Sequence, residues 1–162
     1  GVTINGSPLT LAQYKEGTLT KTGTNTWVFV ATTGLPSSAT ATVATSQTTT
    51  STSFTDLATA GPAVTLTTGT KALVLCYCEQ SNSSTAINVS SFAVSGATTI
   101  AASDTFGLQI NQSVAGYVYS ASIGKIVTGL TAGSNTFTAK YRVSGATGTF
   151  LNRVISVIDL GS

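Results

Sequence analysis

Histidine and methionine are absent from this sequence of 162 residues, and charged residues make up only 7% of it. In ordinary soluble proteins, roughly a quarter of all residues are charged. Without histidine, the chain lacks the commonest general base and the usual partner of a serine or cysteine nucleophile. Its seven cations are scattered and leave a net charge of only +2, so we expect no nucleic-acid partner.

Long apolar runs are also missing from the chain. No run approaches the roughly 18 residues of a membrane-spanning helix, and no signal peptide opens the sequence. We therefore expect no membrane partner. Because position 1 is glycine rather than methionine, we expect the chain to be a processed or trimmed form.

The two cysteines, Cys76 and Cys78, lie two apart near an apolar run. Residues two apart on a flat strand point to the same face and are poorly placed for a disulfide. No histidine is present to complete a metal site with them. We interpret both as small buried thiols rather than as redox or metal-binding groups.

Acidic side chains are few and scattered. The five carboxylates are Glu16, Asp56, Glu79, Asp104 and Asp159. No two are close in sequence, so a facing catalytic pair would have to be assembled by the fold. Asp56 and Asp104 lie in turn-like settings, where aspartate commonly caps the backbone. No phosphate loop, zinc spacing or calcium loop occurs, so we predict a non-enzyme with no catalytic residues, no cofactor and no metal.

Threonine is abundant instead and supplies about one residue in five. Its branched Cβ fits the pleated surface of a strand. Short strand-like segments recur between turns, and no helical period is sustained past residue 20. The expected strands cover residues 39–53, 63–67, 71–79, 86–94, 98–101, 106–110, 116–122 with 125–128, and two more between 129 and 160. This spacing predicts an all-β fold, an antiparallel two-sheet β-sandwich of the jelly-roll type.

A break in the pattern at residues 34–38, GLPSS, predicts a domain boundary. Residues 1–35 are expected to form an N-terminal arm or anchoring segment, or a small hairpin, and residues 36–162 the β-sandwich domain. The tract at 39–53 has the composition of a hydroxyl-rich linker or an O-glycosylated stalk. Its alternation of alanine and threonine has the period of an edge strand, which we favour.

Residues 129–160 are predicted to form a long β-hairpin around a glycine-bearing turn at 144–148. In the first strand, apolar residues share one parity, which indicates one buried and one wet face. The second strand is apolar on both parities, so both of its faces should be covered. We expect another subunit to cover one face, with contacts at Arg153, Ile155 and Val157. Arg153 is the expected buried ion or hydrogen-bond partner.

Tyr117 and Tyr119 share one parity of an expected strand and form a possible glycan or interface contact. A tyrosine ring is apolar while its hydroxyl is polar, so exposed tyrosines stack on sugars or fill protein interfaces. The alternative is packing in the core with other aromatic side chains. We favour core or subunit interface over a ligand platform. Lys140 and Arg142 are expected on the outward face as solvated cations.

Four segments of the chain contain sequence motifs that recur in known proteins. They are FTDLATAGPAVTLTTGTKALV at 54–74, SSFAVSGATTIAASD at 90–104, VTGLTAGSNTFTAKYR at 127–142 and NRVISVI at 152–158. With these segments the chain resembles β-sandwich virion structural proteins of tailed bacteriophages, of the head-decoration or head- or tail-fibre type. The similarity covers about residues 50–160 and carries no catalytic motif.

This resemblance implies a bacteriophage virion structural protein, a capsid decoration (cement) or fibre component that acts through oligomeric β-sandwich packing. It implies a virion location, a homo-oligomer with a trimer as the expected state, and attachment to other virion proteins, the capsid or a fibre shaft, through the N-terminal arm. The alternative is a tail-fibre receptor-binding module that recognises host-surface glycans. A carbohydrate-binding module of a secreted enzyme is disfavoured because the chain has one tryptophan, Trp27, outside the sandwich.

Overall fold

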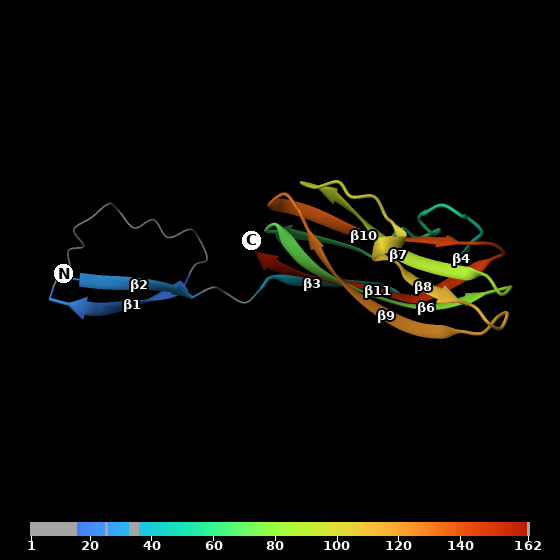
Figure 1. Cartoon of the computed structure of the whole chain (residues 1–162), viewed down its shortest axis with the longest axis horizontal. Helices are drawn as coiled ribbons and strands as arrows, with labels where there is room; N and C mark the ends of the chain where they lie inside the picture. Colours follow the sequence, from blue (N-terminus) through green and yellow to red (C-terminus); the bar gives the residue numbers. More distant parts are fainter. Residues whose placement is uncertain (1–15, 25, 33–35, 162) are drawn as a thin grey trace. The chain divides into compact units, whose positions relative to one another are not determined.

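The computed structural model describes residues 16–24, 26–32 and 36–161. The chain forms two compact units, Gly1–Leu35 and Pro36–Ser162 (Figure 1). In the first unit, β1 (Glu16–Gly23) and β2 (Thr26–Thr32) form a two-stranded antiparallel sheet. No helix in the described part of the chain is long and apolar enough to cross a membrane.

The second unit consists of short strands joined by turns. Its elements are β3 (Ser38–Val43), β4 (Gln47–Thr49), β5 (Ala63–Thr68), β6 (Lys71–Asn82), β7 (Ile87–Gly96), the 3-10 turn η1 (Asp104–Phe106), β8 (Leu108–Asn111), β9 (Tyr119–Thr128), β10 (Gly133–Val143) and β11 (Gly148–Gly161). Most of the tract at 39–53 lies in β3 and β4, as expected from the strand interpretation that we favoured. The expected strand at 98–101 is reduced to one bridge between Val94 and Ile100, and the two segments at 116–128 merge into β9.

These strands form two antiparallel sheets that face each other. The four-stranded sheet has the order β5-β10-β7-β8, and the five-stranded sheet has the order β3-β11-β6-β9 with β4 also paired to β11. If β4 is left out, the other eight strands of this unit can be counted from 1 to 8 along the chain, from β3 to β11. In this count, the five-stranded sheet without β4 has the order 1-8-3-6 and the four-stranded sheet has the order 2-7-4-5. This interleaved arrangement is that of a jelly roll. The predicted all-β sandwich is therefore confirmed.

The predicted hairpin at 129–160 is wrong in its pairing, although both of its strands exist. β10 pairs with β5 and β7, whereas β11 pairs with β3, β4 and β6. The two strands lie in opposite sheets, and the turn between them crosses from one sheet to the other (Figure 1). Neighbouring segments hold this turn, since Ser144 N donates to Ile87 O and Ser83 N donates to Thr147 O, both at 2.9 Å.

The hydrophobic core lies between the two sheets. Alternate residues of each long strand point inward, so the core takes even-numbered residues of β6 and odd-numbered residues of β10. Phe92 lies with its ring centroid 5.1 Å from Phe106 and 6.3 Å from Phe137. Tyr141 and Phe150 meet across the sandwich with centroids 4.9 Å apart. These contacts join β10 and β11 through side chains instead of backbone hydrogen bonds.

Candidate functional site

A β-bulge in β11 decides which of its side chains face the core. Leu151 pairs with Glu79 and Val154 with Tyr77, so two residues of β11 stand opposite one residue of β6. The backbone φ of Asn152 is 48°, a left-handed conformation that asparagine tolerates better than most residues. Inward positions are therefore even-numbered before the bulge and odd-numbered after it. Phe150 and Arg153 consequently both point inward and are buried.

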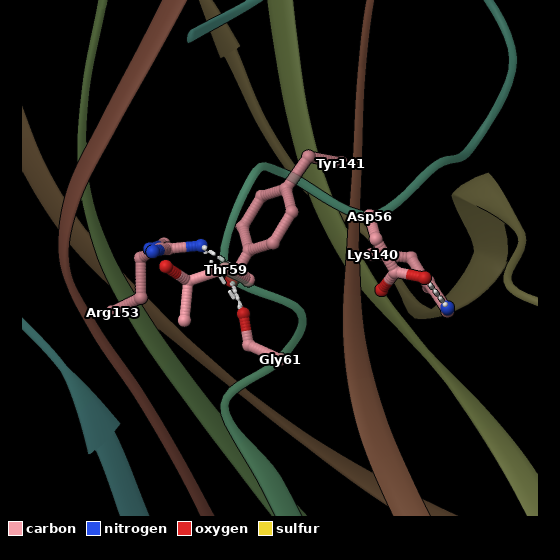
Figure 2. Close-up of polar contacts among 6 residues, drawn as sticks. All are labelled: Asp56, Thr59, Gly61, Lys140, Tyr141 and Arg153. Carbon is pink, nitrogen blue, oxygen red and sulfur yellow. Dashed lines mark hydrogen bonds and ion pairs between the residues drawn. The ribbon is translucent and has the colours of Figure 1, made fainter. Parts of the chain in front are cut away.

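Arg153 is the largest fully buried side chain among the described residues, with 1% of its surface exposed. One terminal nitrogen, Nη1, donates to Gly61 O at 3.2 Å and Thr59 O at 3.5 Å. The other, Nη2, donates to Gln47 Oε1 at 2.8 Å and Thr45 O at 3.4 Å. The guanidinium carbon lies 5.3 Å from the centroid of the Tyr141 ring (Figure 2). Neutral oxygens and an aromatic face thus surround this buried charge.

The structure therefore corrects the expected location of Arg153, Ile155 and Val157. All three point into the sandwich of a single chain and are at most 1% exposed, so they are core residues instead of contacts to another subunit. The apolar residues of the opposite parity, Val154, Ile158 and Leu160, form the outward face of β11. The sequence correctly indicated two apolar faces, but the bulge reverses which one is external.

Cys76 and Cys78 are buried free thiols on the inner face of β6, as predicted. Burial raises the pKa of each thiol from its ordinary 9.0 to about 12. At Cys78 the nearby Arg153 guanidinium opposes this rise in pKa. Burial also raises the pKa of Tyr141, whose hydroxyl donates to Gly61 O at 3.1 Å. These thiols remain protonated at neutral pH, which makes them poor nucleophiles.

These raised pKa values predict that stability falls at alkaline pH. Both thiols ionise near pH 9 in the unfolded chain but only near pH 12 in the folded chain. Their contribution is constant below pH 9 and is lost as the pH rises from 9 towards 12. Urea unfolding at several pH values should show this decline, and the double variant Cys76→Ala, Cys78→Ala should show a weaker one. Equal pH dependence in the two proteins would contradict the prediction.

The outward face of the five-stranded sheet carries an apolar patch. Leu75, Ile126 and Leu160 are 41%, 62% and 43% exposed. Paired positions on neighbouring strands extend the patch with partly exposed side chains, namely Leu73, Tyr77, Val154 and Ile158. We call these seven residues the outer apolar face. Hydroxyl-bearing residues border it on β3 and β9, including Thr40, which bonds Ser156 Oγ at 2.8 Å. An apolar centre with a polar border is the composition of a protein interface.

Tyr117 and Tyr119 lie together at the start of β9, with ring centroids 5.2 Å apart and a tilt of 54° between the planes. Tyr117 is 60% exposed, and the neighbouring Val114 and Val118 are 57% and 50% exposed. The Tyr119 hydroxyl is 3.1 Å from Ser113 Oγ. The two rings thus form an exposed cluster outside the core, and their tilt prevents them from making one flat platform.

The outward face of β10 carries two ion pairs instead of the solvated cations expected from the sequence. Lys140 Nζ lies 2.7 Å from Asp56 Oδ2, on the opposite side of β10 from Tyr141 (Figure 2). Arg142 binds Asp104 through two parallel hydrogen bonds of 2.9 and 2.7 Å. Each pair joins residues far apart in sequence, so local sequence patterns could not indicate these contacts.

Asp159 and Glu79, like Asp56 and Asp104, make structural contacts. Asp159 accepts from Gly69 N at 2.8 Å and Gly161 N at 3.1 Å. Glu79 accepts from Tyr77 Oη at 2.9 Å and Asn152 Nδ2 at 3.0 Å. Among the residues that the structure describes, no three of His, Cys, Asp and Glu cluster as metal ligands.

Comparison with known proteins gives a likeness of fold. No family model matches the chain, and no curated protein sequence matches it. A chain in the structure of infectious bursal disease virus, Gt strain, aligns with a TM-score of 0.58 at 9% sequence identity, covering 86% of this chain. A chain of the Gx strain aligns with a TM-score of 0.48 at 9% identity, also over 86%. The present chain spans about a third of the length of these neighbours, 37% and 36%.

Proposed function

We propose that this chain is a virion structural protein of a tailed bacteriophage, a capsid decoration or fibre component without catalytic activity. The observation that carries the proposal is the outer apolar face, an uncovered patch on a jelly-roll sheet. The motif resemblance over about residues 50–160 supports a phage virion protein. The jelly roll, an architecture that occurs in viral capsid domains and in lectins, is compatible with this role. The fold neighbour belongs to the structure of a virus, which agrees with a virion location.

In this proposal the sandwich associates with further copies of the chain through the outer apolar face. A trimer is the state that the resemblance implies. Burying exposed leucine and isoleucine side chains is favourable by roughly 25 cal/mol per Å² of apolar surface. A stable contact would need to bury more than about 1,000 Å² in total. The N-terminal unit, residues 1–35, would fix the sandwich to the capsid or a fibre shaft.

Charges placed on the outer apolar face are expected to dissociate the assembly. Light scattering coupled to size-exclusion chromatography should give three times the chain mass of 16.3 kDa for the unmodified protein. The double variant Leu75→Asp, Ile126→Asp should elute as a monomer, because a desolvated carboxylate disfavours association.

A control places a single carboxylate on the opposite sheet. Thr67, on β5, is exposed and outward, so Thr67→Asp should leave the mass unchanged. If the unmodified chain is a monomer at micromolar concentration, or if Thr67→Asp dissociates it equally, the proposed packing surface is wrong.

The exposed cluster at Tyr117 supports a second function, a tail-fibre receptor-binding module that recognises host-surface glycans. Its ring and the neighbouring valines offer apolar surface next to hydroxyl groups, as sugar rings require. This function predicts that saccharide binding is lost in the double variant Tyr117→Ala, Tyr119→Ala.

A further inference from the structure

A groove on the outward face of the four-stranded sheet is separate from both surfaces described above. It is open to solvent and has a volume of about 590 Å³. Ala93 of β7 and Lys140 and Arg142 of β10 form its floor. One wall is the segment 52–54 and the other is the segment 101–104.

Both walls of this groove are held in place by hydrogen bonds. Thr55 and Tyr141 exchange two backbone hydrogen bonds of 2.9 and 3.0 Å, which fixes the first wall along β10. On the other side, Ser91 Oγ donates to Ser103 O at 2.8 Å and fixes the second wall on β7. The groove is therefore preorganised, which reduces the entropy lost when a ligand binds.

The charges beside the groove cancel in pairs. Arg142 binds Asp104 in the second wall through two hydrogen bonds, and its guanidinium carbon lies 5.4 Å from the centroid of the Phe54 ring in the first wall. Lys140 is paired with Asp56. The side chains of Asp56 and Asp104 are 43% and 50% exposed, so their oxygens can still accept hydrogen bonds from a ligand.

We propose that this groove binds a neutral saccharide. A charged ligand would have to compete with one of the two ion pairs, whereas sugar hydroxyls can donate to the carboxylates and accept from the cations without breaking them. Phe54, Ala93, Ala101 and Ala102 supply apolar surface for the C–H faces of a sugar ring. Apolar surface beside a few fixed polar groups is the usual composition of a small-ligand site.

This inference rests on the second of the two functions proposed above, saccharide recognition, and moves the site from the tyrosine cluster to the groove. It is independent of packing through the outer apolar face, which lies on the other sheet. No binding of the unmodified chain to any saccharide would be a failure of saccharide recognition, whereas saccharide binding that the groove variants leave unchanged would be a failure of the groove alone.

The test is an array of neutral oligosaccharides with matched sialylated and sulfated forms, probed with the full chain. The strongest neutral hit is then titrated by calorimetry. Asp104→Asn and Lys140→Gln should each weaken binding about tenfold or more, because each removes a charge-assisted hydrogen bond. Thr136→Ala, on the outward face of β10 but outside the groove lining, should bind as the unmodified chain does.

Urea midpoints of the groove variants should stay close to that of the unmodified chain, since exposed ion pairs contribute little to stability. Binding only to sialylated or sulfated probes, or no binding to the array, would overturn the proposal. Full affinity in both groove variants with loss in Tyr117→Ala, Tyr119→Ala would place the saccharide at the tyrosine cluster and also overturn it.

Discussion

Replacing Arg153 by alanine is expected to lower the free energy of unfolding by about 3–5 kcal/mol, the cost typical of breaking a buried charged network. The guanidinium contacts the carbonyls of Gly61, Thr59 and Thr45 and the side chain of Gln47. Removing it takes the guanidinium donor away from the part-buried carbonyls of Thr59 and Thr45 and opens a cavity beside Tyr141. Arg153→Lys should be intermediate, because an ammonium cannot reproduce the fork of donors.

Arg142→Ala is the matched control for this prediction. Arg142 lies on the neighbouring segment of the chain, but its side chain is 20% exposed and its partner Asp104 is 50% exposed. Exposed ion pairs typically contribute about 0.2–1 kcal/mol, so this variant should unfold close to the unmodified protein in urea. Equal losses of stability in the two variants would contradict the inward placement of Arg153.

Truncation of Phe150 to alanine is expected to cost about 3–5 kcal/mol of unfolding free energy. Its side chain is fully buried and packs on Tyr141 of the opposite sheet, with ring centroids 4.9 Å apart. The variant would therefore lose a contact that joins β11 to β10 across the core. The free energy of unfolding, measured by urea denaturation, tests this expectation.

Leu151, the next residue along β11, provides the comparison for Phe150. It is outward and half-buried, so Leu151→Ala should cost much less than Phe150→Ala. Similar losses in the two variants would contradict the inward placement of Phe150.

The sequence indicated much of the local structure because alternation and turns are local properties. The apolar residues that share one parity of β10 were correctly assigned to a buried face. They are the core residues Phe137, Ala139, Tyr141 and Val143. Cys76 and Cys78 were correctly expected to be buried free thiols. The interface residues and the ion pairs could not be obtained in this way. The position of the interface residues depended on one extra residue in β11. The ion pairs join residues that are separated by 38 positions in one pair and by 84 positions in the other.

The sequence by itself determined that this chain folds as an antiparallel β-sandwich, because its threonine-rich alternation and frequent turns suit strands and exclude long helices. It also determined that β11 has two apolar faces. Only the tertiary structure decided which face is internal, because the bulge at Asn152 shifts the inward parity by one residue. The pairing of the strands was likewise decided only by the tertiary structure, because the backbone groups of β10 and β11 form hydrogen bonds with different strands in opposite sheets.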